Sequence, residues 1–164
     1  MRRQTANLAR FCANTHLWTM ISAIIPTYNE EHTIGSLLEN LRELGTEEVI
    51  VADGNSADRT VEIASTYGRV ICSKTCRALQ MNAGARASSG DVLLFLHSDV
   101  RLGLGGLAAV RNSMRNPEVV GGNFDIRYEG SDWVAAAFTF NKSLAPGARG
   151  LLRRLGDLLP PQGL

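Results

Sequence analysis

The chain has 164 residues, 45% of them hydrophobic, which suits one domain with a sizeable core. Its 17 lysines and arginines nearly balance its 16 aspartates and glutamates. No overall charge therefore favours nucleic acid or an anionic membrane as a partner, and function is expected to reside in a local site.

The cysteines and the hydropathy pattern indicate where the protein works. Cys12, Cys72 and Cys76 form neither an even disulfide set nor a zinc pattern, which favours a reducing cytosol and thiols that serve in packing. The most apolar run, Val92 to Leu96, is far shorter than the ~20 residues of a membrane-spanning helix. We expect a cytoplasmic protein without a transmembrane segment, and peripheral association with the inner face of the membrane stays open.

The first part of the chain predicts an extension followed by a strand and a helix. Residues 1–19 lack a continuous apolar run and are expected to be a disordered extension, with Met20 as an alternative start. A strand is predicted over Ile21 to Ile25, ending at Pro26. The helix after it has apolar residues at helical spacing and stops at Gly45.

The same unit is then repeated. A strand over Glu48 to Ala52 leads into a polar turn, after which Asp58 can cap a helix that ends near Gly68. A third strand is predicted over Arg69 to Ser73, followed by a small-residue-rich helix over Arg77 to Ala87 that packs closely on its neighbours. Alternating strands and helices predict an α/β fold with parallel strands and crossover helices.

The most apolar strand comes next and indicates the centre of the sheet. Val92 to Leu96 is expected to be buried on both faces. Beyond it we predict a helix from Leu104 to Asn116 and a strand over Val119 to Phe124. A hairpin partner around Ile126 to Tyr128 and a last helix from Asp132 are expected to follow.

Polar clusters follow three of the predicted strands, where each strand ends. They are Thr27 to Glu31, Asp53 to Ser56, and His97 to Asp99. Ligands of open α/β sheets bind at these strand ends, so the clusters are expected to converge. Tyr28 can lie against a nucleobase, Asp53 can accept hydrogen bonds from base or ribose, and Asp99 can hold a divalent cation against a diphosphate. Together the clusters predict a nucleotide-diphosphate site.

Five motifs follow one another along this part of the chain. They are Ile24 to Glu31, Val51 to Thr60, Gln80 to Ala85, Gly90-Asp91, and Leu94 to Asp99. In this order and spacing they resemble the opening of the family 2 glycosyltransferases, and several ordered motifs are more specific than any single one. The resemblance covers about Ile21 to Phe124. It implies a GT-A fold, a Rossmann-like and mostly parallel sheet flanked by helices, and sugar transfer with inversion from a nucleotide-diphosphate sugar, a UDP-sugar above all.

The resemblance also implies which side chains contact the donor. They are Pro26, Tyr28, Glu30, Asp53, Arg77 and Asn82. The first three are expected to lie along uridine or an equivalent base, and Asp53 to bind the base or the ribose. Arg77 and Asn82 are expected near the phosphates or the sugar.

The chain is most similar to a bacterial branch in which a histidine replaces the first aspartate of the metal-binding D-x-D motif. Asp99 is expected to ligate Mg²⁺ or Mn²⁺ together with the diphosphate, and His97 is the second candidate ligand. A neutral imidazole suits Mn²⁺ better than Mg²⁺, and a structural role for His97 stays open. Some members of the branch carry labels naming a carotenoid-acid transferase, so a lipid or a carotenoid acid is a candidate for the unknown acceptor.

Two other functions stay open. Gly103, Gly105 and Ala108 form a G-x-G-x-x-A string, as in NAD-dependent dehydrogenases. That fingerprint requires its first glycine directly after a strand, whereas His97 to Leu102 intervene here. The second alternative is a nucleotide-binding module without catalysis, the remnant of a truncated gene.

The end of the chain bears on catalysis. Inversion requires a general base, which in the family is an acidic residue well after the D-x-D motif. Only 40 residues follow Phe124, and within them Gly156-Asp157 and Gln162 to Leu164 resemble a motif of the branch that an insertion has broken. We expect residues 20–124 to form the nucleotide-sugar-binding core and 125–164 to begin a C-terminally truncated acceptor region. The catalytic base stays unassigned, since three acidic residues lie too early for that role: Asp125, Glu129 and Asp132.

Overall fold

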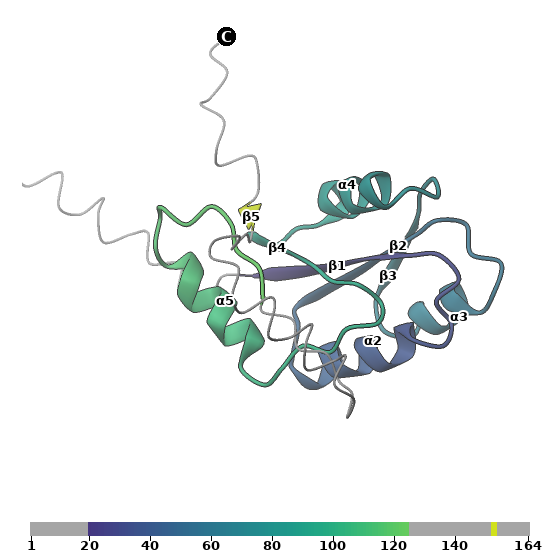
Figure 1. The fold of residues 1–164 in the computed structure, drawn as a ribbon, viewed down its shortest axis with the longest axis horizontal. Coiled ribbons are helices and arrows are strands. Elements are labelled where there is room, and N and C mark those ends of the chain that lie inside the picture. Colours follow the sequence, from purple (N-terminus) through teal and green to yellow (C-terminus); the bar gives the residue numbers. More distant parts are fainter. Residues whose placement is uncertain (1–19, 125–151, 154–164) are drawn as a thin grey trace, which may run out of the picture.

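The computed structural model describes residues 20–124 and 152–153. Within them a five-stranded sheet forms the centre of the fold (Figure 1). Its strands are β1 (Ile21–Thr27), β2 (Glu48–Asp53), β3 (Arg69–Cys72), β4 (Val92–Phe95) and β5 (Leu152–Arg153). The order is β3-β2-β1-β4-β5, with β1 to β4 parallel and β5 antiparallel to β4. The predicted α/β class with a mostly parallel sheet is confirmed.

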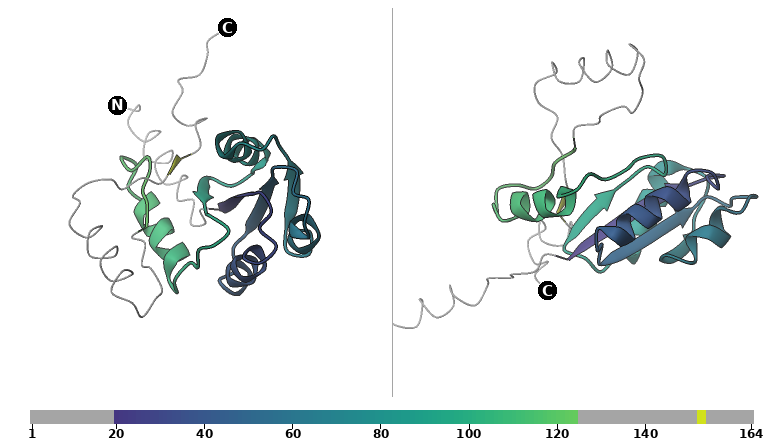
Figure 2. Two further views of the ribbon diagram at one scale, coloured as in Figure 1. Left: turned by 45° about the vertical axis from the view of Figure 1, so that its right-hand side comes forward. Right: turned by 90° about the horizontal axis from the view of Figure 1, so that it is seen from below.

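Helices cover both faces of this sheet. In the described part of the chain they are α2 (Ile34–Glu43), α3 (Thr60–Ala64), α4 (Arg77–Ala87) and α5 (Gly106–Met114). Figures 1 and 2 show α2 and α3 on one face and α4 on the other. The strands proceed from β1 to β3 in one direction and β4 then returns to the far side of β1, so the order reverses at β1. Ligands of open α/β sheets bind beyond the strand ends at such a reversal.

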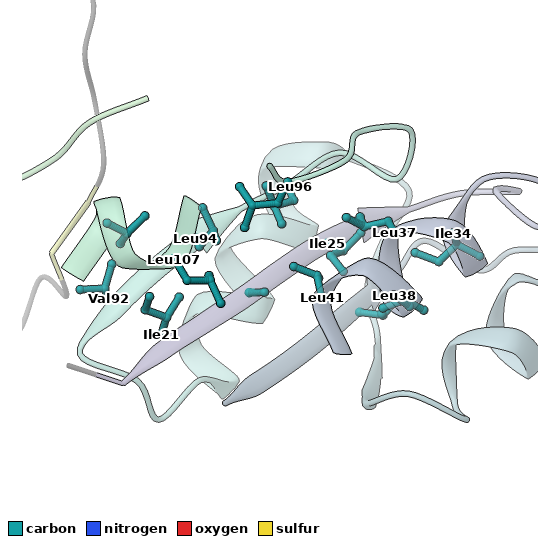
Figure 3. Close-up of a cluster of buried hydrophobic side chains, with 14 of the residues drawn as sticks. Ile21, Ile25, Ile34, Leu37, Leu38, Leu41, Val92, Leu94, Leu96 and Leu107 are labelled. Carbon is teal, nitrogen blue, oxygen red and sulfur yellow. The ribbon is translucent and has the colours of Figure 1, made fainter. Parts of the chain in front are cut away.

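The main hydrophobic core lies between the sheet and helices α2 and α5. On α2 the apolar residues recur every three or four positions, and Ile34, Leu37, Leu38 and Leu41 are at most 1% exposed. They pack in one cluster with side chains of β1, β4 and α5 (Figure 3). Burying each such side chain is worth about 1.5–3 kcal/mol. This packing holds β1 and β4, whose ends carry polar clusters, in fixed positions.

Helix α4 packs closely on the opposite face, as its small residues predict. A Cβ atom at Gly84 would lie 2.3 Å from Cγ2 of Ile24 in β1, far closer than non-bonded carbon atoms approach in proteins. Glycine is therefore required at this crossing. The close approach brings the first turn of α4 to the ends of β1 and β2.

The structure differs from the sequence prediction at Pro26. Strand β1 continues through Pro26 to Thr27, and Pro26 pairs in register with Ala52. Proline has no N–H group to donate. Backbone groups of a strand point alternately to its two neighbours, and the carbonyl of Ile24 accepts from the N–H of Leu96, 3.0 Å away on the β4 side. Pro26 faces that same side, where the assigned strand β4 ends at Phe95, whereas Thr27 faces the β2 side and its carbonyl accepts from the Gly54 N–H, so the missing N–H does not interrupt the pairing with β2.

The predicted strand over Val119 to Phe124 is wrong. These residues have no regular secondary structure, and β5 rather than this segment lies beside β4. The paired glycines Gly121 and Gly122 disfavour a strand because they have no side chains to pack and lose the most backbone freedom on ordering. The predicted hairpin partner and the helix from Asp132 lie outside the described residues. Among the described residues, no helix is long and apolar enough to span a bilayer.

Candidate functional site

A cleft of about 200 Å³ lies beyond the C-terminal end of β1, between the loop after this strand and the start of α4. Its lining residues are Pro26, Thr27, Tyr28, Glu30, Thr75, Cys76, Arg77 and Gln80. Four of the six predicted donor-contacting residues line this cleft: Pro26, Tyr28, Glu30 and Arg77. Tyr28 leaves 51% of its surface exposed, so its ring is available to a ligand.

Asp53 lies behind the cleft rather than on its wall. The residue is 1% exposed. Its Oδ1 accepts hydrogen bonds from Thr27 Oγ1 at 3.1 Å and from Ser56 Oγ at 2.5 Å, and its Oδ2 accepts from the Ser56 N–H at 2.8 Å. One buried carboxylate thus ties the end of β1 to the turn after β2. The structure gives Asp53 a role in shaping the site, and its direct contact with base or ribose stays a prediction.

Two loops at the edge of the cleft are joined by reciprocal hydrogen bonds. The Asn29 N–H donates to Ser56 Oγ at 2.9 Å, and the Ala57 N–H donates back to Asn29 Oδ1 at 2.8 Å. Asn29 and Asn55 have φ angles of 55° and 65°, a left-handed conformation that asparagine tolerates better than most residues. Left-handed residues outside glycine cluster at ligand sites, where surrounding contacts hold them in place.

A second pair of hydrogen bonds joins the same two loops at residues further along the chain. The Glu31 N–H donates to Asp58 Oδ2 at 3.1 Å, and the Arg59 N–H donates to Glu31 Oε2 at 3.0 Å. Desolvation raises the pKa of Asp58, but hydrogen bonds from the Thr60 side chain and from the N–H groups of Thr60 and Glu31 outweigh it and leave the pKa below its ordinary value. Asp58 receives the Thr60 N–H at the start of α3, as predicted, although α3 ends at Ala64, short of Gly68.

Gln80 lines the cleft but is not among the site residues predicted from the sequence. It is 4% exposed, and its Nε2 donates to the carbonyls of Thr27 at 2.6 Å and Ala52 at 3.0 Å. The Gly54 N–H also donates to the Thr27 carbonyl, at 2.9 Å. A Cβ atom on Gly54 would lie 2.9 Å from Gln80 Nε2, so glycine leaves the room that this amide occupies. The only signal in the sequence is a polar residue on a helix face that otherwise carries small residues.

The start of α4 provides the positive side of the cleft. Arg77, the first residue of α4, is exposed, and within the described residues its guanidinium has no ion-pair partner. The first N–H groups of a helix carry a partial positive charge, which adds to that of Arg77. Asn82 lies on the same helix but is exposed outside the cleft, and its contact with a donor stays a prediction.

The cysteine prediction is wrong for the two cysteines that the structure describes. Cys72 and Cys76 are free and exposed rather than packed. Cys72 ends β3, the edge strand, and Cys76 precedes α4 at the mouth of the cleft. Both thiols are therefore accessible at the edge of the sheet and at the cleft rather than part of the core.

The third polar cluster follows β4. His97 and Asp99 are both exposed, whereas Ser98 between them is 6% exposed. No hydrogen bond or ion pair links His97 or Asp99 to the other two clusters within the part of the chain that the structure describes. That part also contains no group of three or more His, Cys, Asp or Glu residues that could hold a metal. The structure thus joins two of the clusters directly and leaves the third as a separate loop at the same sheet edge.

Comparison with known proteins decides the family. The model of glycosyl transferase family 2 matches residues 22–157. The chain belongs to this family. Similar proteins include an uncharacterized glycosyltransferase of Haemophilus influenzae, 39% identical over 49% of this chain, and a 4,4'-diaponeurosporenoate glycosyltransferase of Staphylococcus haemolyticus, 35% identical over 50% of this chain. The matched segments amount to 29% and 24% of those two proteins.

The fold agrees with that of a solved structure. It is the crystal structure of glucosyl-3-phosphoglycerate synthase from Mycobacterium tuberculosis in complex with Mn²⁺, uridine diphosphate and glucosyl-3-phosphoglycerate. The TM-score is 0.56 at 24% identity, over 64% of this chain and 43% of that one. This likeness supports the GT-A fold.

Family membership leaves the glycine string without a cofactor role. Gly103 and Gly105 lie just before α5, and β4 ends at Phe95, well before them. Gly105 has a φ of 82° and directly precedes the helix, which explains a glycine there by backbone conformation alone. A dehydrogenase is therefore not supported.

Proposed function

We propose that this chain binds a nucleoside-diphosphate sugar, a UDP-sugar in the first place, and serves as the donor-binding part of an inverting glycosyltransferase. The observation that carries the proposal is the cleft at the end of β1. It combines an exposed aromatic ring, Tyr28, with a cation, Arg77, that has no ion-pair partner among the described residues, and buried hydrogen bonds hold the adjoining loops in place.

The nucleotide would lie across this cleft with the base toward β1. Pro26, Tyr28 and Glu30 line that side, and a planar base can lie against the Tyr28 ring. Arg77 and the first N–H groups of α4 are placed to attract the diphosphate, because both carry positive charge where anions bind best. Asn82, further along α4, is proposed to reach the sugar or the phosphates only from outside the cleft.

A divalent metal fits the loop after β4. An exposed carboxylate at Asp99 and an exposed imidazole at His97 offer two side-chain ligands, and Mg²⁺ or Mn²⁺ commonly takes its remaining ligands from substrate phosphates and water. Among the described residues no group of three or more acidic, histidine or cysteine side chains could hold a metal, so we assign the remaining ligands to the diphosphate and water. Such a metal would offset negative charge on the leaving diphosphate.

The proposed reaction is attack of an acceptor hydroxyl on the anomeric carbon of the donor. The bond from that carbon to the diphosphate breaks as the new bond forms on the opposite face, which inverts the configuration. A general base must take the hydroxyl proton, and we assign none among the described residues. The name of the Staphylococcus haemolyticus relative makes a carotenoid acid one candidate acceptor, and an ionised acid would attack through a carboxylate oxygen without needing a base.

Thermal unfolding in the presence of nucleotides tests the proposal. A ligand that binds only the folded protein stabilises it by about 2.7 kcal/mol at a hundredfold excess over its Kd. UDP and UDP-glucose with Mn²⁺ are expected to raise the Tm, and NAD is not. Stabilisation by NAD alone would contradict the proposal. Release of free sugar from UDP-glucose would separate a catalyst from a module that only binds nucleotides.

A further inference from the structure

Gln80 has one polar atom that its own contacts leave unused. Both hydrogens of Nε2 have acceptors, since Nε2 lies 2.6 Å from the Thr27 carbonyl oxygen and 3.0 Å from that of Ala52. These two carbonyls also fix the orientation of the amide, because its oxygen cannot face them. The other atom, Oε1, receives no hydrogen bond from any residue that the structure describes.

This oxygen opens onto the cleft. Among the described residues the only fully enclosed side-chain nitrogen or oxygen without a partner is Thr46 Oγ1, so Gln80 Oε1 keeps access to the outside. Gln80 is 4% exposed and lines the cleft, so its small exposed part faces the cleft. A nine-tenths buried amide therefore presents a fixed acceptor to any ligand that enters.

An acceptor at this position selects the chemistry of what lies over it. Phosphate oxygens are acceptors at neutral pH and cannot bond to it, so the diphosphate belongs at Arg77 instead. The group above Gln80 must carry an N–H or O–H donor. Tyr28 and Gln80 line the same cleft, and Gln80 holds the carbonyl of Thr27, which directly precedes Tyr28, so a base lying on the Tyr28 ring occupies the cleft onto which Oε1 opens.

On these contacts we propose that Gln80 determines base specificity by accepting a hydrogen bond from the imide N–H of a uracil-type base. This inference rests on the proposed function and deepens it. Cytosine has a bare lone pair where uracil has its N3–H, and this lone pair would face Oε1. A ribose hydroxyl is the alternative donor to Oε1, and the experiment must distinguish it from the imide N–H of the base.

The experiment titrates UDP, CDP and 2′-deoxy-UDP by calorimetry into the wild-type chain and into Gln80→Met, which keeps the side-chain length but removes both polar atoms. The wild-type chain is expected to bind UDP about tenfold or more tightly than CDP. Gln80→Met is expected to bring the two affinities within about twofold, whatever it does to affinity as a whole. Arg86→Ala, at the far end of α4, is the control and should keep the wild-type ratio.

The outcomes separate this inference from the proposed function. Equal affinity for UDP and CDP in the wild-type chain, or an unchanged preference in Gln80→Met, would overturn the role of Gln80 while UDP binding stands. A preference for UDP over 2′-deoxy-UDP that alone disappears in Gln80→Met would assign the oxygen to the ribose and overturn the inference. Failure to bind any of the three nucleotides would remove the proposed function itself.

A second measurement covers a Gln80→Met chain that does not fold. The sequence contains three glutamines, Gln4, Gln80 and Gln162, so the side-chain amide of Gln80 can be followed by NMR in the ¹⁵N-labelled wild-type protein. UDP is expected to shift the Gln80 amide signals, because a hydrogen bond to Oε1 polarises the whole amide. Unshifted Gln80 signals at saturating UDP would overturn the inference.

Discussion

At the scale of single residues, Asp53 supports the site through the hydrogen bonds that its buried carboxylate accepts. Replacing it with asparagine puts an N–H₂ group where Thr27 and Ser56 donate. We expect Asp53→Asn to weaken UDP binding by about 1–3 kcal/mol, measured by calorimetry, because donors that faced the carboxylate lose their partner. Asp91→Asn, at the opposite edge of the sheet where Asp91 accepts from the Met20 N–H, is the matched control. Unchanged affinity in Asp53→Asn would remove Asp53 from the nucleotide site.

Gly84 tests the packing that places Gln80. A methyl group at this position would meet Ile24 Cγ2 at 2.3 Å, and neither the strand nor the helix can withdraw without opening the core. Gly84→Ala is expected to lower the free energy of unfolding by about 1–3 kcal/mol in urea, against the small gain alanine brings to a helix. Gly103→Ala meets no atom within 4 Å and should stay within about 0.5 kcal/mol of the wild type. A stable Gly84→Ala protein would show that α4 can shift over β1.

At the scale of elements, the N-terminal edge of the sheet is held by Glu48 of β2. Its carboxylate accepts from the Ser89 N–H at 2.9 Å and from Ser89 Oγ at 2.7 Å, and also from Ser22 Oγ. Desolvation raises the pKa of Glu48, but the hydrogen bonds from Ser22, Ser89 and Gly90 together outweigh it and leave the pKa below 4.5. Ionised Glu48 thus links β1, β2 and the turn before β4, far from the cleft.

The lowered pKa fixes the sign of a pH dependence. A carboxylate whose pKa is lower in the folded than in the unfolded state stabilises the fold above the unfolded pKa, and this stability is lost as the pH falls through the folded value. The stability difference between wild type and Glu48→Gln, measured by urea unfolding, should be largest near neutral pH. It should shrink below about pH 4.5, the ordinary value for this group. A difference that does not change with pH would contradict the account.

The elements also show what the sequence could predict. The bounds of α4 were predicted over Arg77 to Ala87 and are confirmed, because small residues and flanking turns mark this helix locally. The extension of β1 through Pro26 was missed because it depends on pairing with β2, which is tertiary information. Gln80 was missed for the same reason, since its partners lie 53 and 28 residues away along the chain. Local sequence patterns predict helices and strands, but the packing of these elements against one another decides which polar atoms form hydrogen bonds.

At the scale of the whole molecule, the family is established and the activity is a proposal. The chain spans 29% and 24% of the two curated relatives described above, so their activities cannot be transferred to it as a whole. The predicted C-terminal truncation and the predicted acceptor region concern residues that lie mostly outside the described part. The donor cleft, by contrast, is lined entirely by described residues of β1, the loop after β1, the loop before α4, and α4.

The central claim is that this cleft and the loop after β4 bind a nucleoside diphosphate with a divalent metal. The most direct measurement is calorimetric titration of UDP with Mn²⁺ and again with EDTA, in the wild-type chain and in Asp99→Ala. We expect UDP binding that Mn²⁺ strengthens, and the strengthening should be lost in Asp99→Ala because its carboxylate shares the metal with the diphosphate. No UDP binding in the wild-type chain with Mn²⁺ would contradict the account, and full Mn²⁺ dependence in Asp99→Ala would contradict the metal assignment.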